Sequence, residues 1–88
     1  MIAKRLIVRG RVQGVFYRDW TVETVGKLSV TGWVRNRDDG TVEAHVEGEP
    51  PLVERMIEHM HSGPPMARVE RIESRSTENE CFTSFERR

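Results

Sequence analysis

The chain has 88 residues, of which 36% are hydrophobic and 32% are charged, as in an ordinary soluble globular protein. A chain of this length is expected to form one domain over residues 1–88. Its 14 Lys and Arg residues balance 14 Asp and Glu residues. The net charge of zero argues against a protein that binds the long phosphate backbone of a nucleic acid.

The cysteine content and the apolar runs bear on where the protein works. Cys81 is the single cysteine, so no disulfide can form within the chain, which suits a reducing compartment. The apolar run Leu6-Ile7-Val8 is interrupted by Arg9. It is too short for a signal-peptide core, and nothing approaches the about 20 apolar residues of a membrane span. We therefore expect a cytoplasmic protein without a membrane segment.

The N-terminal half predicts a strand, a helix and a hairpin. Residues 4–9 include three apolar residues in succession, as in a strand covered on both faces. Residues 19–28 are predicted to be helical, although their many β-branched residues mean that tertiary packing must hold the helix. Asp38-Asp39-Gly40 is typical of a hairpin turn, and it joins strands expected at 31–37 and 41–48.

The C-terminal half predicts a second helix and two strands. Pro50-Pro51 suits the first helical turn. The helix then carries an apolar stripe at i, i+3, i+4 and i+7, formed by Val53, Met56, Ile57 and Met60. Gly63-Pro64-Pro65 ends it, and strands are expected at 66–75 and 82–87. The order β-α-β-β-α-β with a short final strand indicates an α+β, ferredoxin-like sandwich, in which two helices cover one face of a mostly antiparallel sheet.

The segment Gly10-Arg11-Val12-Gln13-Gly14-Val15-Phe16-Tyr17-Arg18 joins the first strand to the first helix. Its two glycines, four residues apart, allow the backbone to curl so that successive N–H groups converge. The segment ends on an arginine near a helix N-terminus, and amides and a guanidinium together favour phosphate. The residues thus describe either a phosphate-binding loop or a glycine-rich connection with an ordinary surface arginine.

Topology places Asn36 beside this loop. Two parallel strands joined by a helix bring their carboxyl ends to one edge of the sheet, so the loop and Asn36 should be neighbours. Alternatively, Asn36 is a strand-end residue whose side chain satisfies the turn. Arg35 and Arg37 should point to the opposite face, because side chains alternate along a strand.

Several other chemistries are not indicated by the sequence. His45, His59 and His61 do not have the spacing of metal ligands. Cys81 has no base near it in the sequence. The Gly-x-x-x-x-Gly-Lys loop of P-loop nucleotide hydrolases is absent. We expect neither a metal nor a cofactor.

At this point the residues resemble the acylphosphatase family. The Gly10–Arg18 segment matches the family's first signature. The run Gly32-Trp33-Val34-Arg35-Asn36, followed by Gly40-Thr41-Val42, resembles its second signature. The run Gly63-Pro64-Pro65-Met66-Ala67-Arg68-Val69 resembles the family's link into its fourth strand. The similarity spans nearly the whole chain, and the two signatures together are specific.

The resemblance implies a function and a set of site residues. The family hydrolyses a carboxyl–phosphate anhydride, without metal, to a carboxylate and inorganic phosphate. Its phosphate-binding arginine falls on Arg18 and its water-positioning asparagine on Asn36. Its phosphate-binding loop falls on Val12, Gln13, Gly14, Val15, Phe16 and Tyr17. The partners expected are a small acyl phosphate and inorganic phosphate, with no nucleic acid and no membrane, and the protein is expected to be a monomer.

The sequence departs from the family pattern at two positions. Asp19 follows the arginine where the family usually has a small residue. It is either a first-turn acid that interacts with the helix dipole or a carboxylate that pairs with Arg18 and weakens anion binding. Ser29 replaces a glycine that the family often has at the end of the helix, so a positive φ there would strain the backbone.

Two other function classes compete with catalysis. A related module could bind an acyl phosphate, carbamoyl phosphate or another anion without turning it over, although the presence of both Arg18 and Asn36 favours hydrolysis. Ferredoxin-like sheets also bind RNA, but they then expose aromatic residues on the central strands for stacking. Here the first strand is aliphatic, and the third offers only Val42, Ala44 and Val46.

Overall fold

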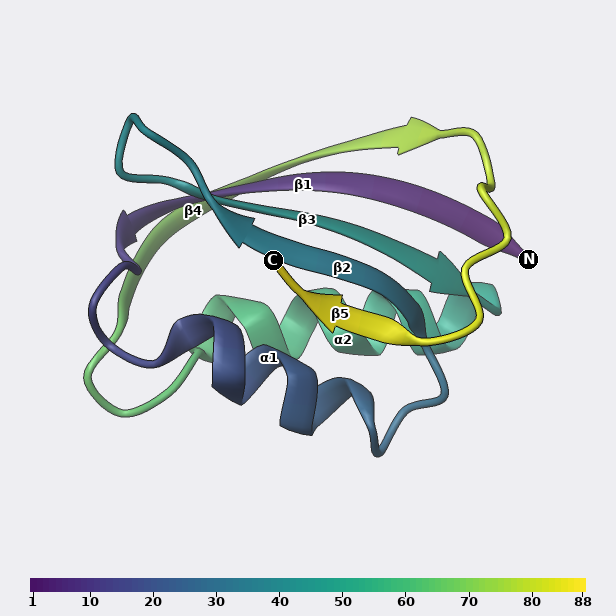
Figure 1. Cartoon of the computed structure of the whole chain (residues 1–88), viewed down its shortest axis with the longest axis horizontal. Helices are drawn as coiled ribbons and strands as arrows, with labels where there is room; N and C mark the ends of the chain where they lie inside the picture. The colour runs from purple at the N-terminus through teal and green to yellow at the C-terminus, as the bar shows by residue number, and fades with distance from the viewer.

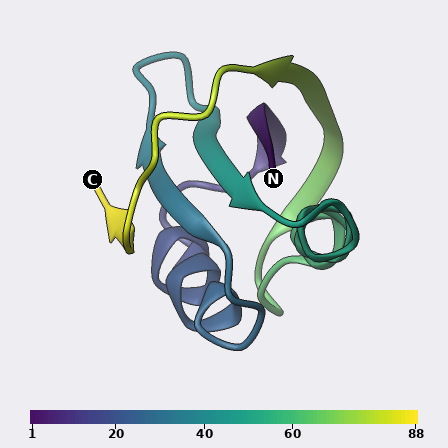
Figure 2. The same ribbon diagram turned by 90° about the vertical axis from the view of Figure 1, so that its right-hand side faces the viewer.

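The computed structural model describes residues 1–88 as a five-stranded sheet with two helices on one of its faces (Figure 1, Figure 2). This arrangement confirms the predicted order of elements and the ferredoxin-like architecture. The elements are β1 (Ile2–Arg11), α1 (Tyr17–Val25), β2 (Thr31–Asn36), β3 (Val42–Gly48), α2 (Pro50–Ser62), β4 (Arg68–Thr77) and β5 (Phe85–Arg87).

The strand order across the sheet is β4-β1-β3-β2-β5. Strand β3 runs antiparallel to both β1 and β2, so β1 and β2 point the same way. Val42 of β3 lies opposite Val8 of β1 on one side and opposite Asn36 of β2 on the other. The end of β2 is therefore level with Val8, three residues before the end of β1, and the loop that follows β1 starts at the edge of the sheet where Asn36 lies.

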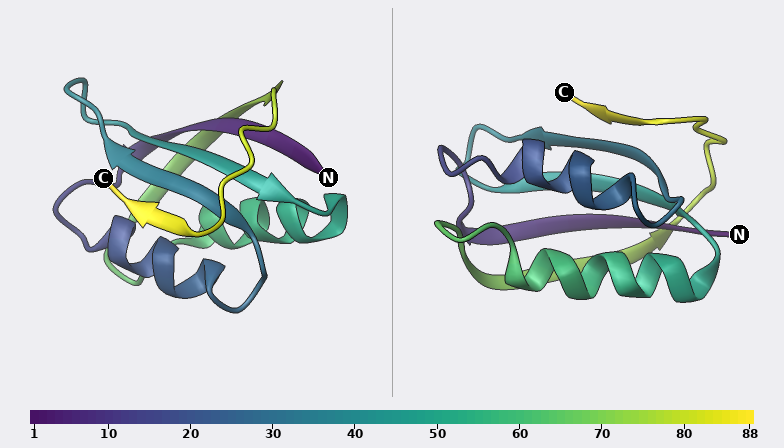
Figure 3. Two further views of the ribbon diagram at one scale, coloured as in Figure 1. Left: turned by 45° about the vertical axis from the view of Figure 1, so that its right-hand side comes forward. Right: turned by 90° about the horizontal axis from the view of Figure 1, so that it is seen from below.

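The core lies between the sheet and the helices, which run beside each other across the face they cover (Figure 3). The stripe predicted on α2 supplies Val53, Met56 and Met60, each fully buried. Leu6 and Val8 of β1 face them from the sheet. Ile7 lies on the other face, half-buried beside charged side chains, so the expectation of a strand covered on both faces is wrong for this residue.

Helix α1 differs from the prediction at both ends. It begins at Tyr17 rather than at residue 19, because the Tyr17 side chain is buried and fixes the first turn against α2. It ends at Val25, so Gly26 follows the helix as its C-cap residue, in a right-handed conformation, and does not weaken the helix interior. Ser29 has φ 54°, which confirms the strain expected at this position. No helix is both long and apolar enough to cross a lipid bilayer.

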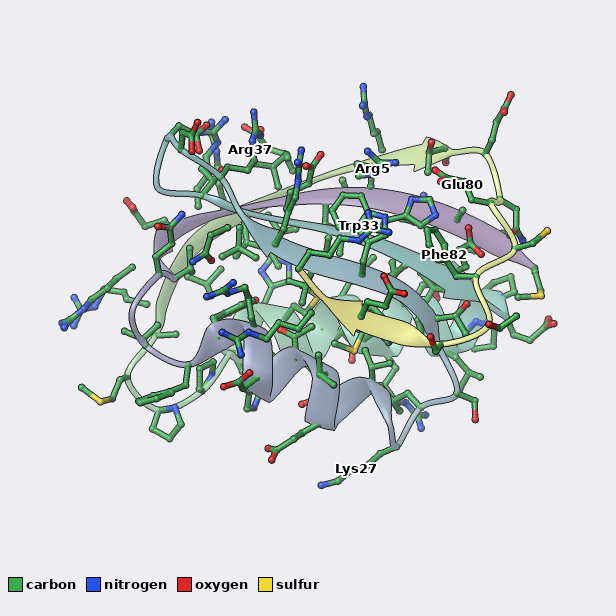
Figure 4. The ribbon with its side chains drawn as sticks, in the orientation of Figure 1. Arg5, Lys27, Trp33, Arg37, Glu80 and Phe82 are labelled. Atoms are coloured by element: carbon green, nitrogen blue, oxygen red, sulfur yellow. The ribbon has the colours of Figure 1, made fainter.

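The face of the sheet away from the helices is partly covered by the segment that leads into β5. Figure 4 shows Arg5, Trp33, Glu80 and Phe82 on this side. Beneath them the side chains of His45 and Glu47 are fully buried, although both belong to the solvent-facing set of β3. Two aromatic rings enclose the imidazole: Trp33 stacks on it and Phe82 packs at an angle.

Glu47 holds this covering segment to the sheet. Its carboxylate accepts hydrogen bonds from His45 Nε2 at 2.7 Å, from the Phe82 amide at 3.1 Å and from the Glu80 amide. Burial by itself would raise the pKa of Glu47, but the hydrogen bonds from His45, Glu80 and Phe82 outweigh it and hold the pKa below its ordinary value. The ionised carboxylate is thus the form that fits this site.

We predict that Glu47→Gln destabilises the fold at neutral pH by about 1–3 kcal/mol, because the new NH₂ group faces a buried donor and leaves it unpaired. The folded-state pKa of Glu47 lies below its ordinary value of 4.5. Its contribution is therefore complete above that pH and is lost as the pH falls below it. Urea unfolding at pH 7 and at pH 3.5 should show the difference between wild type and variant shrinking in acid.

The matched control for this substitution is Glu54→Gln on the exposed face of α2. We expect it to change the free energy of unfolding by no more than about 0.5 kcal/mol at either pH. Equal stability of Glu47→Gln and wild type at pH 7 would contradict the anchoring role of Glu47.

Candidate active site

A small cavity opens at the edge of the sheet where β1 and β2 end. It measures about 260 Å³, which suits a phosphate-sized group with a small substituent better than a drug-sized ligand. Its lining comes from the β1–α1 loop, the first turn of α1, the end of β2 and β5. The lining residues are Val12, Gly14, Phe16, Tyr17, Arg18, Asp19, Asn36 and Arg87.

The loop between β1 and α1 presents unpaired backbone amides. None of the N–H groups of residues 12–16 donates a hydrogen bond within the protein. The first amides of α1 continue this run, because the first N–H groups of a helix have no intrahelical partner. Gly14 and Phe16 adopt left-handed φ values of 73° and 65°, which turn the backbone around one point. Such a run of amides is suited to an anion.

Apart from the exposed Phe16, the larger side chains of this loop hold it in place rather than face a ligand. Val12, Val15 and Tyr17 are buried in the core. The Tyr17 hydroxyl donates to the carbonyl of Met60 at 2.6 Å, and burial raises the pKa of this phenol. Gln13 donates from Nε2 to two carbonyls of the β2–β3 hairpin, 2.8 and 2.9 Å away. Within the predicted loop residues 12–17, the groups free to bind phosphate are therefore amides.

Arg18 lies in the first turn of α1 and lines the cavity, as predicted. Its Nη1 atom donates to the backbone carbonyl of Arg88 at 2.8 Å. This contact fixes one side of the guanidinium and leaves its other donors available. Neither Arg87 nor Arg88 was predicted as a neighbour of this site, because a strand of three residues has no periodicity that reveals its pairing.

Asn36 lines the same cavity, so the structure brings together the two residues that the sequence analysis singled out. Its Oδ1 atom is buried and has no hydrogen-bond partner. The adjacent turn is closed without it: the Arg37 amide donates to the Thr41 carbonyl, and Asp39 accepts from the Thr41 amide and hydroxyl. The alternative, in which the Asn36 side chain satisfies the turn, is therefore wrong.

Asp19 does not pair with Arg18. Its Oδ1 atom lies 3.2 Å from Nη1 of Arg87, which reaches across from β5. Asp19 does occupy the first turn of α1, where an acid suits the helix dipole. The hypothesis that the Asp19 carboxylate pairs with Arg18 is wrong, because Asp19 forms its ion pair with Arg87.

The other charged residues considered in the sequence lie elsewhere. Arg35 points to the opposite face of the sheet, as strand alternation predicts, where it pairs with Glu43 and lies over the Trp33 ring. His45 is buried on that same face. No three His, Cys, Asp or Glu side chains come close enough together to hold a metal ion.

Known proteins with similar sequences are acylphosphatases. The acylphosphatase family model matches residues 4–87. An acylphosphatase of Acidiphilium cryptum is 55% identical over 69 residues, which are 78% of this chain and 76% of the relative. One of Thermococcus kodakarensis is 48% identical over 84 residues, which cover 96% of this chain and 92% of the relative.

Solved structures show the same relationship. The crystal structure of acylphosphatase from Bacillus subtilis superposes with a TM-score of 0.95 at 36% sequence identity, and the match covers 98% of this chain and 97% of the other. Sequence motifs, fold and site geometry thus point the same way as the family match over nearly the full length. The chain belongs to the acylphosphatase family.

Proposed function

We propose that this protein is an acylphosphatase that hydrolyses small acyl phosphates to a carboxylate and inorganic phosphate, with no metal or cofactor. The observation that carries the proposal is that Asn36 lines the same small cavity as Arg18 and the amides of the loop, and that its buried Oδ1 has no hydrogen-bond partner in the protein. A binding module needs only the anion site. Hydrolysis also needs a group that holds a water molecule beside the phosphate, and the unpaired Oδ1 of Asn36 is an acceptor that can do so.

The loop and Arg18 would bind the phosphoryl group. Amides at the start of a helix attract an anion, and the guanidinium adds a full positive charge with several donors. A carboxylate is a good leaving group, so the reaction depends on positioning the water and on stabilising the charge of the transition state more than on a strong base. Donors fixed in advance by the fold supply that stabilisation without reorganising during the reaction.

Asn36 would orient the attacking water. Its Oδ1 accepts a hydrogen bond from the water and directs a lone pair of the water oxygen towards phosphorus. A bond forms between that oxygen and phosphorus while the bond from phosphorus to the acyl oxygen breaks, and its electron pair leaves with the carboxylate. A phosphate oxygen takes the proton from the water. None of these steps needs a histidine, and Asp19 is already paired with Arg87.

The proposal includes a monomer that works in the cytoplasm. The groups that the proposed reaction uses, which are the loop amides, Arg18 and Asn36, lie together in one copy of the chain, so the reaction needs no residue from a second copy. The single cysteine suits a reducing compartment. The first feature supports the monomer and the second supports the cytoplasmic location. Size-exclusion chromatography with light scattering tests the monomer directly.

For Arg18→Ala we expect the rate of acyl phosphate hydrolysis to fall by about 10³-fold or more, as for other arginines that stabilise a transferring phosphoryl group. Phosphate release from benzoyl phosphate, measured with EDTA present, checks this. Arg55→Ala on the exposed face of α2 is the matched control and should retain wild-type turnover. An Arg18→Ala variant with near-full activity would remove Arg18 from the mechanism.

For Asn36→Ala we expect kcat to fall by about 10²–10³-fold, comparable to the loss of one fixed hydrogen-bonding group at a transition state. Because Asn36 is assigned to water rather than to phosphate, competitive inhibition by inorganic phosphate should keep its wild-type Ki. A variant that loses phosphate binding together with turnover would show that Asn36 contacts the anion instead. Wild-type protein that binds phosphate but releases none from benzoyl phosphate would establish the binding module.

A further inference from the structure

The mouth of the cavity carries a second arginine that the hydrolysis of the phosphoryl group does not use. We propose that Arg87, which pairs with Asp19 in the free protein, selects acyl phosphates whose acyl group bears a second negative charge by exchanging Asp19 for that charge. This inference rests on the proposed function and assigns the class of substrate. It concerns only the part of the substrate that lies outside the amide loop.

Strand β5 determines where Arg87 lies. It pairs in parallel with β2, and Arg87 is opposite Val34, two residues before Asn36. The strand is fixed beyond this point by the Arg88 amide, which donates to the Val34 carbonyl at 2.8 Å. Side chains alternate along the strand, so the Arg88 guanidinium lies over Trp33 on the open face while Arg87 lines the cavity.

The phosphate site dictates where the acyl group must extend. With the phosphoryl group among the amides and Arg18, the acyl group points towards the open side of the cavity. The residues exposed there are Phe16, whose side chain is 74% accessible, Asp19 and Arg87. An acyl group leaving the loop therefore meets an aromatic ring and a guanidinium. A flat, apolar body with an anionic end matches both.

The ion pair between Asp19 and Arg87 is suited to exchange. Its two side chains are 58% and 51% accessible, and an ion pair so exposed to water contributes little to stability. A carboxylate or phosphate on the acyl group can thus replace Asp19 as the partner of Arg87 at small cost. In the free protein, Asp19 neutralises Arg87, whose place at the mouth is set by strand β5, so that Arg18 remains the cation beside the amides.

The test compares two substrates that differ only at the outer end. Benzoyl phosphate has a neutral ring, and 4-carboxybenzoyl phosphate adds a carboxylate at the position farthest from the phosphate. The measured quantity is the selectivity ratio, kcat/KM for the carboxylated substrate divided by kcat/KM for benzoyl phosphate. Arg87→Gln should lower this ratio by about threefold to fivefold, the range of a single exposed ion pair. Asp19→Asn should raise it by a similar factor, since the competing carboxylate is gone.

Arg55→Gln removes the same charge from an exposed position on α2, outside the cavity, and should leave the ratio at its wild-type value. An unchanged or higher ratio in Arg87→Gln would overturn the assignment, and so would a lower ratio in Asp19→Asn. Wild-type turnover of benzoyl phosphate with no effect of either variant on the ratio would leave the proposed function standing and refute this inference alone. Failure of wild type to hydrolyse either compound would refute the proposed function and this inference with it.

Discussion

The left-handed turn of the backbone between Gly14 and Phe16 is the constraint on which the site depends. Phe16 is not a glycine, and its φ of 65° costs about 1–2 kcal/mol relative to a right-handed conformation. The cost is offset by its neighbours, because Val15 and Tyr17 are buried on either side of it. If Phe16 relaxed, one of these side chains would leave the core. Packing of the core therefore holds the loop amides in the orientation set by this turn.

Gln13 and Gly32 fix the position of this loop relative to β2. Gln13 ties the loop to the hairpin through two carbonyls, so the loop cannot move away from the strand that carries Asn36. Gly32 fixes β2 against β3, since a Cβ atom at that position would lie 1.7 Å from the carbonyl oxygen of His45. Any shift of β2 would change the depth of Asn36 relative to the amides. One side chain and one missing side chain thus set the position of the loop amides relative to Asn36.

The sequence predicted those features that local chemistry determines. The glycine spacing indicated the curled loop after β1, the Asp38-Asp39-Gly40 turn indicated the hairpin, and the period of α2 indicated its buried face. The sequence could not predict that Glu47 is buried and holds the segment before β5. The alternation of β3 marks this residue as facing away from the core and does not show which segment covers it. The prediction of which residue pairs with Asp19 failed for the same reason. Arg87 reaches it through a three-residue parallel strand, and that pairing depends on contacts distant in the sequence.

Strand β5 connects the two faces of the sheet. On the open face Glu47 holds the segment that precedes it, and at the edge Arg88 and Arg87 meet Arg18 and Asp19. Amides and one arginine recognise a phosphoryl group whatever acyl group it carries. Discrimination among acyl phosphates must therefore come from residues outside the loop. In the proposed function the loop amides and Arg18 bind the phosphoryl group, whereas the charged residues exposed beyond the loop, Asp19 at the start of α1 and Arg87 on β5, would select the acyl group.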